Sequence, residues 1–390
     1  MVPYLYHGLS PSEDGASTMP SKTVGRVTLD EADQQLLNIL QTAFPLVTRP
    51  FEALAARLDL SEGEVMERFT RLKGERIIRQ VSAIFDTRKL GYKSSLVATA
   101  LPEDRVDEAA EIINAHPGVS HNYRRNHEFN LWWTVAVPPE MDLAVHVNAL
   151  HRLTEARSTR VLPTLKLYKI GVDLDVSDQR AMAAQSVLPA YRETPRTAAD
   201  LTAEERGYVL ELQEDLAVEP TPFASMAQRL GTSEDALVKA AEGLIDEGLM
   251  RRFAAVLHHR RAGFGANAMS VWRVPGAEEA TGGADAPDSG DRTDEFGYQL
   301  AGYAAVSHCY RRPTYPDWPY ALFGMIHATS KERVEEAVAD IRQRTDLDDH
   351  QLLYSTKEYK KVRVRFFDPA YQQWQDANVA AADAVQPAGS

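Results

Sequence analysis

Hydrophobic positions along the chain change from helical spacing to strand alternation twice, once in each half. In the first half Leu36, Leu37 and Leu40 have helical spacing, and a second group with this spacing follows at 51–58. Ser61 and Glu64 have the spacing of a capping box, so a third helix is expected to begin there. Three short helices with tight connections predict a helix-turn-helix module.

After residue 91 the pattern predicts the order strand, helix, strand, strand, helix, strand, which is that of a ferredoxin-like domain. The first half is expected to have strands at 95–100, 119–125, 129–137 and 160–170, and helices at 106–115 and 142–153. The second half is expected to repeat this order at about 267–274, 296–304, 305–312, 320–327, 331–344 and 350–366. The predicted fold class is therefore α+β.

A tandem duplication explains why the pattern occurs twice. Val-Ser-His-Asn-Tyr-Arg-Arg at 119–125 returns as Val-Ser-His-Cys-Tyr-Arg-Arg at 306–312, an offset of 187 residues (308−121), whereas the earlier elements are offset by 172 (233−61). The extra residues fall in 277–295, which we interpret as a flexible acidic insertion. The predicted organisation is a disordered tail at 1–25, helix-turn-helix domains at 26–90 and 201–262, ferredoxin-like domains at 91–180 and 263–369, a linker at 181–200 and a second disordered tail at 370–390.

The composition excludes several classes of protein. With 43 Lys and Arg against 56 Asp and Glu, the net charge of −13 argues against a protein that coats phosphate backbones, although a local basic pocket is compatible with it. A single cysteine excludes an intramolecular disulfide and a thiolate metal site within one chain, and it suits a reducing compartment. No run approaches the roughly 18 apolar residues that a membrane span needs. We expect a soluble, cytoplasmic protein without a membrane partner.

The start of each predicted third helix argues against DNA binding. A recognition helix presents its first residues to base edges between phosphates. Here those residues include Glu62 and Glu64 in one half and Glu234 and Asp235 in the other, which phosphate charge repels. We therefore expect no DNA partner, and we interpret the modules as scaffolds for packing and dimerisation.

The duplicated motif carries the candidate chemistry. Alternate residues of a strand share a face, so His121, Tyr123 and Arg125 are expected to point one way. The second copy places His308, Tyr310 and Arg312 in the same pattern. Such a row costs burial energy unless it faces a polar ligand or partner. A solvated edge, or a row of salt bridges at a dimer interface, is the alternative interpretation.

A second basic cluster follows the second helix-turn-helix module. It comprises Arg251 and Arg252 and the run His258, His259, Arg260 and Arg261. Together with the duplicated motif, it has the chemistry to enclose a polyanionic small molecule. The histidines show no zinc-site spacing, so we predict no protein-bound metal. Cys309 is interpreted as a small buried residue rather than a nucleophile.

These segments resemble the sirohaem decarboxylases, an Lrp/AsnC-like family. The resemblance rests on both tyrosine-arginine motifs, on Asp317-Trp318-Pro319-Tyr320, on Met325-Ile326-His327, and on the stretches 89–92 and 251–255. It covers about 27–370; the first half resembles the A-type (or D-type) subunit and the second the B-type (or L-type), as in the fused NirDL form. Where B-type sequences often have Asn after Trp-Pro-Tyr, this chain has Ala321.

The resemblance implies that two acetate side chains of sirohaem lose CO₂ and leave methyl groups, in the pathway of haem d1 or of an alternative haem. The iron belongs to the substrate, so no separate cofactor is implied, and His121, His258 or His259 is a candidate iron ligand. The candidate catalytic residues are His308, Tyr310, Arg311, His121 and Tyr123. The candidate substrate-binding residues are Arg312, Arg124, Arg125, Arg251, Arg252, His258, His259, Arg260, Trp318 and Tyr320.

Two further hypotheses complete the analysis. The rival functions are an Lrp/AsnC-type DNA-binding regulator and a haem sensor without catalysis. The halves are expected to form an internal pseudo-dimer, and chains to pair into a homodimer. The main site is predicted on the second half, because Asp86 of the first half would repel a substrate carboxylate that His258 could receive, with Trp318 and Tyr320 as a wall. His121, Tyr123 and Arg124 would complete it or form a weaker site.

Overall fold

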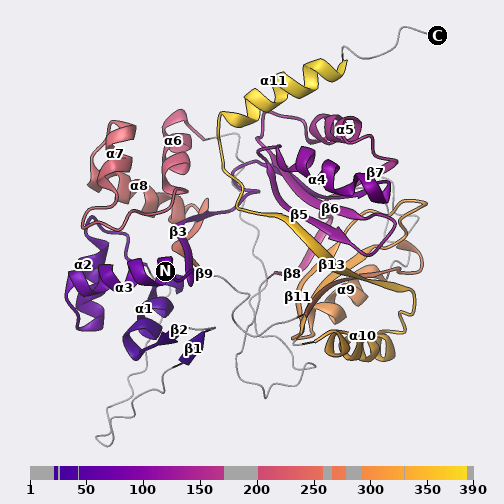
Figure 1. Cartoon of the computed structure of the whole chain (residues 1–390), viewed down its shortest axis with the longest axis horizontal. Helices are drawn as coiled ribbons and strands as arrows, with labels where there is room; N and C mark the ends of the chain where they lie inside the picture. Colours follow the sequence, from indigo (N-terminus) through magenta and orange to yellow (C-terminus); the bar gives the residue numbers. More distant parts are fainter. Residues whose placement is uncertain are drawn as a thin grey trace, which may run out of the picture.

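The computed structural model describes residues 22–24, 27–42, 44–170, 201–257, 266–277, 292–328 and 330–383. The predicted linker, most of the acidic insertion, and His258, His259 and Arg260 lie outside the described residues. Figure 1 shows two parts: a group of helices around two strands, and a larger part built on strands with helices on its outer sides. No helix in the described part of the chain is long and apolar enough to cross a membrane.

Each half contributes three helices to the first part. They are α1 (Glu31–Thr42), α2 (Pro50–Leu58) and α3 (Glu62–Gly74), and then α6 (Ala203–Leu212), α7 (Ala224–Leu230) and α8 (Glu234–Asp246). The capping box is present at α3, where the Glu64 amide donates to Ser61 Oγ and the Ser61 amide donates to the Glu64 carboxylate. A short hairpin, β1 (Lys22–Val24) and β2 (Val27–Leu29), precedes α1, so part of the predicted N-terminal tail forms a strand.

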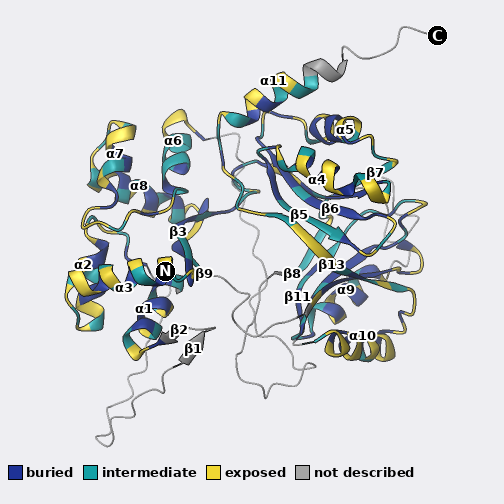
Figure 2. Ribbon diagram, in the orientation of Figure 1, coloured by how far each residue is buried: buried dark blue, intermediate teal, exposed yellow. Residues whose placement is uncertain are grey.

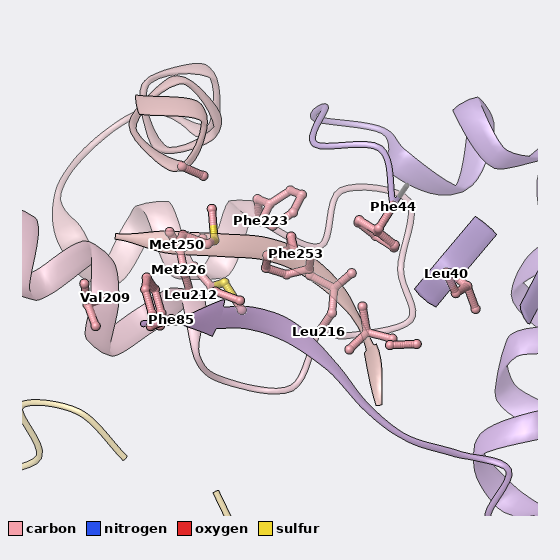
Figure 3. Packing of buried hydrophobic residues seen from close by; sticks show 14 of the residues in the cluster. Leu40, Phe44, Phe85, Val209, Leu212, Leu216, Phe223, Met226, Met250 and Phe253 are labelled. Carbon is pink, nitrogen blue, oxygen red and sulfur yellow. The ribbon is translucent and has the colours of Figure 1, made fainter. Parts of the chain in front are cut away.

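The two helical modules are joined by a two-stranded antiparallel sheet. Strand β3 (Ile78–Phe85) comes from the first half and β9 (Met250–Leu257) from the second. Their apolar side chains and those of the helices form one core (Figure 3), in which the ring of Phe253 lies 5.3 Å from that of Phe44 and 5.6 Å from that of Phe223. The modules therefore pack as one unit rather than as two separate domains.

The second part contains the two ferredoxin-like domains. The first supplies β4 (Lys93–Ala100), the short helix η1 (Glu103–Arg105), α4 (Val106–Asn114), β5 (Val119–Arg125), β6 (Leu131–Val137), α5 (Leu143–Leu153), β7 (Ser158–Leu162) and β8 (Lys166–Ile170). The second supplies β10 (Ala266–Trp272), α9 (Thr293–Ala301), β11 (Val306–Arg311), β12 (Leu322–Ala328), α10 (Lys331–Thr345) and β13 (His350–Lys361). The pairing order is β7-β4-β6-β5-β13-β10-β12-β11-β8.

The two domains exchange their last strands. Strand β13 pairs first with β10 of its own half and then, from Ser355 onward, with β5 of the first half. In the same way β7 pairs with β4, whereas β8 pairs with β11 of the second half. The prediction of one strand at 160–170 was therefore wrong. Pro163, which has no N–H to donate, lies at the break between the two strands.

Helices cover the outer faces of the strands, and a separate core fills the space between the inner faces. In Figure 1, α4 and α5 lie over the strands of the first half and α9 and α10 over those of the second. Figure 2 shows that the exposed residues of α5 and α10 lie on their outer sides. Between the inner faces, Trp132 and Trp318 are both buried with ring centroids 5.1 Å apart.

The second predicted tail is also partly ordered. Residues Ala370–Asp383 form helix α11, which lies against α5. Its Tyr371 and Trp374 are buried, and Trp374 stacks on His146 of α5 with a centroid separation of 5.2 Å. The prediction of disorder from residue 370 was wrong because these two aromatic side chains anchor the helix to the first half.

Candidate active site

The two histidine-tyrosine-arginine rows have the common face that strand alternation predicts. We call His121, Tyr123 and Arg125 on β5 the first row, and their counterparts His308, Tyr310 and Arg312 the second row. In each row the histidine and tyrosine rings stack with centroids 6.2 Å apart. The guanidinium group lies over the tyrosine ring, at 5.8 Å in the first row and 4.8 Å in the second.

The residues between the row members point to the opposite, helix-covered face. Asn122 is buried and donates from Nδ2 to the Ala110 carbonyl of α4, at 3.3 Å. Cys309 occupies the matching position, is fully buried, and contacts the Gly297 carbonyl of α9. Burial raises the pKa of its thiol to about 12, so it is a poor nucleophile. The sequence interpretation of Cys309 as a packing residue agrees with this geometry.

Arg125 and Arg312 each reach across to a carbonyl of the other half. Nη1 of Arg125 donates to the Leu353 carbonyl at 2.6 Å, and Nη1 of Arg312 donates to the Leu162 carbonyl. Burial lowers the pKa of each to about 10. The Nε atom of each is buried without a partner, and neither forms an ion pair with an acid among the described residues. Each is therefore a cation with capacity for an anionic ligand; Arg125 is buried and Arg312 is half-buried.

Both row histidines are held by the preceding serine. Ser120 Oγ lies 3.0 Å from His121 Nδ1, and Ser307 Oγ lies 2.7 Å from His308 Nδ1. Burial first, and then nearby positive charge, lowers the pKa of each imidazole to about 4. Without a bound anion, both are neutral at pH 7.

Arg124 and Arg311 do not join the rows, although the sequence analysis placed them with the site residues. As strand neighbours of the row members they point the other way. Arg124 forms an ion pair with Glu103 of η1. Arg311 lies 3.8 Å from Asp294 of α9.

Trp318 and Tyr320 also differ from the sequence interpretation. Trp318 is fully buried and packs edge-on against Phe129, Trp132 and Tyr320, with centroids 5.0 to 5.7 Å apart. Tyr320 is only 9% exposed. These residues therefore form the core between the strands rather than an accessible wall.

Strands β3 and β9, one from each half, pair with each other in an antiparallel sheet. A residue on one of these strands can therefore lie beside the row of the other half. Arg251 pairs with Asp86 at 2.8 Å, and both Arg251 and Arg88 lie close enough to Tyr310 to lower its pKa, although burial raises it overall. Arg252, in contrast, lies with Arg363. The argument that Asp86 repels substrate from the first half was therefore wrong, because Asp86 is neutralised by Arg251 on the side of the second row.

Sequence reasoning missed two basic residues on the side of the first row. Arg79 of β3 donates from Nη2 to the Lys361 carbonyl at 2.8 Å, and its charge contributes to lowering the pKa of His121. Arg363 follows β13 and donates from Nη1 to Ser82 Oγ at 2.9 Å. Both belong to alternating polar stretches near strand ends, and only the strand exchange brings them together.

Comparisons with known proteins identify the family. The AsnC-like ligand binding domain matches residues 89–169 and 261–360, and the Siroheme decarboxylase NirDL-like HTH domain matches 33–79 and 209–251. The "Siroheme decarboxylase" of Hydrogenobacter thermophilus is 37% identical over 87% of this chain and 96% of its own length. This chain belongs to the sirohaem decarboxylase family. The NirDL subunit of Paracoccus denitrificans is 33% identical over 86% of this chain and 97% of its own.

Other members of the sirohaem decarboxylase family are separate alpha or beta subunits, each of which matches less than half of this chain. The alpha subunit of Desulfovibrio desulfuricans is 42% identical but covers 37% of this chain and 83% of its own length. The crystal structure of the siroheme decarboxylase NirDL has a TM-score of 0.69 and 33% identity, covering 90% of this chain and all of that one. A second structure, with the same TM-score and 32% identity, is a co-complex with an iron-uroporphyrin III analogue.

Proposed function

We propose that this protein decarboxylates sirohaem, removing two acetate carboxyl groups as CO₂. The observation that carries the proposal is the match over nearly the whole length to proteins named sirohaem decarboxylases. The two rows supply suitable chemistry, because each combines an imidazole and a phenol with a guanidinium whose Nε atom is buried. The iron is part of the substrate, and the described residues contain no group of three His, Cys, Asp or Glu side chains able to hold a metal ion.

In the proposed reaction the bond between the acetate methylene carbon and its carboxyl carbon breaks, CO₂ leaves, and the electron pair passes into the macrocycle. The methylene carbon then takes a proton and becomes a methyl group. Arginines hold the other carboxylates, and a row histidine gives the proton. General acid help of this kind contributes roughly 10²–10⁴ in rate.

The low pKa of the row histidines links proton donation to substrate binding. An imidazole with a pKa of about 4 carries little proton at pH 7. A substrate carboxylate beside it favours the charged form and raises that pKa. The donor would thus become charged only when substrate is present. Tyr310, whose pKa burial raises, remains protonated and is the alternative donor in the second row.

The decisive experiment is anaerobic incubation of the purified protein with sirohaem, followed by mass spectrometry. Loss of two CO₂ units supports the enzyme. A bound but unchanged tetrapyrrole would instead support a haem sensor. Salt-sensitive DNA binding without tetrapyrrole binding would support a regulator.

The remaining expectations are part of the same proposal. We expect a cytoplasmic enzyme whose product enters haem d1 or an alternative haem pathway. We expect no DNA partner, since Glu62 and Glu64 at the start of α3 are engaged with Arg49 and the Ser61 cap. Two chains would pair through exposed helix-turn-helix faces, and sedimentation showing only monomer at micromolar concentration would contradict that pairing.

A further inference from the structure

Three arginines from distant segments gather beside the first row. Arg363 contacts Ser82 and lies 3.4 Å from the Ala83 carbonyl of β3. Arg252 of β9 lies opposite Ile84 in the strand pairing, so its side chain is on the same face as that of Ser82. Arg79, near the start of β3, is fixed to the Lys361 carbonyl. Burial, and the charges of Arg79 and Arg252, lower the pKa of Arg363 to about 10.

The charge of this cluster is not balanced within the described part of the chain. None of the three arginines forms an ion pair with a described acidic residue, whereas Arg365, two positions after Arg363, pairs with Glu214 at 2.5 Å and with Asp368 at 2.9 Å. Grouping three guanidinium groups without acids costs electrostatic free energy. Such a cost is offset when an anionic ligand binds, and guanidinium groups bind carboxylates with two parallel hydrogen bonds.

The duplication shows that the cluster belongs to one row only. Arg79, Arg252 and Arg363 correspond to Arg251, Gln80 and Val172 at the offsets of 172 and 191 (357−166). Only one of the three counterparts is basic, and that residue is paired with Asp86. In the described part of the chain the second row therefore has Arg88 near Tyr310 and Arg312, but no equivalent group of three arginines at these positions.

We infer that Arg79, Arg252 and Arg363 form a carboxylate-binding subsite that holds the side-chain carboxylates of the tetrapyrrole next to His121. The inference rests on the proposed function. It assigns substrate positioning to the first row and to the C-terminal segment. Because β3 comes from the first half, and β9 and the segment after β13 come from the second, the subsite requires both halves.

The test compares binding of two tetrapyrroles to the full-length protein by absorbance titration. Iron uroporphyrin III is rich in carboxylates, and iron protoporphyrin IX has few. For Arg363→Gln and Arg252→Gln we expect the Kd for iron uroporphyrin III to rise at least about tenfold, equivalent to about 1.4 kcal/mol. The Kd for iron protoporphyrin IX should change much less. Arg365→Gln is the matched control and should bind both as the wild type does.

Two results separate the inference from the proposed function. If the wild type binds and decarboxylates sirohaem, but Arg363→Gln and Arg252→Gln bind iron uroporphyrin III as tightly as the wild type, the subsite is wrong and the function stands. Equal losses for both tetrapyrroles would also overturn it, since they would indicate a general structural role. If the wild type neither binds nor converts sirohaem, the proposed function fails and the subsite with it.

Discussion

The two rows have the same side chains and nearly the same geometry but different surroundings. Beside the first row, Arg79, Arg252 and Arg363 lack acidic partners among the described residues. Beside the second row, Arg251 is neutralised by Asp86. Duplication therefore preserved the reacting groups twice. Among the described residues, three arginines gather beside the first row, whereas beside the second row Arg88 lies near Tyr310 and Arg312. Residues next to a motif can distinguish its copies when the motif itself cannot.

The largest expected effect separates the rows directly. His121→Ala should lower the rate of CO₂ loss by roughly 10²–10⁴, the usual contribution of a general acid. His308→Ala should have a much smaller effect, because no cluster of three arginines lies beside the second row in the described part of the chain. Rates from single-turnover assays, with sirohaem binding measured separately, give the comparison. The reverse order of effects would place the chemistry on the second row.

The Asp86–Arg251 pair tests whether charge neutralisation distinguishes the rows. Asp86→Ala should lower the free energy of unfolding by about 3 kcal/mol. The variant loses the hydrogen bonds that the buried Asp86 carboxylate accepts from Arg251 and from the amides of Arg88 and Lys89. Urea denaturation measures this change. The affinity of Asp86→Ala for iron uroporphyrin III should equal that of the wild type, whereas the affinity of Arg363→Gln should fall. A comparable loss of affinity in both variants would contradict the difference between the two rows.

A buried histidine pair provides a difference in pH dependence between the halves. The Gly118 amide donates to His116 Nδ1, His116 Nε2 then donates to His146 Nδ1 at 2.9 Å, and His146 Nε2 donates to Gln375 of α11. The 187-residue offset places Tyr303 at the position of His116 in the second half. The second half therefore has no matching pair of histidines at this position. Only the first half depends on two buried imidazoles that must stay neutral.

Acid should loosen the first half before the second. Burial, and then the charges of His146 and Lys360, lower the pKa of His116 to about 3, below its unfolded value. Stability is thus present above about pH 6.5 and is lost as the pH falls, by about 2 kcal/mol at pH 5. Hydrogen exchange at pH 5 and pH 7 should show loss of protection in α5 and α11, with less change in α10. A His116→Gln variant should reduce this pH dependence, and equal acid sensitivity of α5 and α10 would exclude the mechanism.

The smallest effects are expected at the outward-pointing arginines. Arg124→Ala and Arg311→Ala remove partly exposed ion pairs, each worth about 0–1 kcal/mol. Turnover should remain within about threefold of the wild type, a factor that corresponds to less than 1 kcal/mol. Steady-state rates and melting temperatures measure both. A large loss of turnover would mean that the outward arginines contact the substrate as well.

Local patterns in the sequence predicted most elements but not their partners. The Ser61 capping box and the common face of His121, Tyr123 and Arg125 depend on neighbouring residues, so they could be read from the sequence. The partners of β8 could not, because hydrogen bonds between distant strands leave no periodic signal. Arg363 was missed for the same reason: its contacts are with β3, at Ser82 and Ala83.

The exchange of strands also has a consequence for synthesis of the chain. Arg125 binds the Leu353 carbonyl across a separation of 228 residues. At ~5–20 residues per second, β5 waits roughly 10–45 s on the ribosome before its partner emerges. During that interval its edge has unpaired amide and carbonyl groups, which are prone to associate with other strands. Slow translation or limiting chaperone should therefore reduce the yield of active protein even when the mature fold is stable.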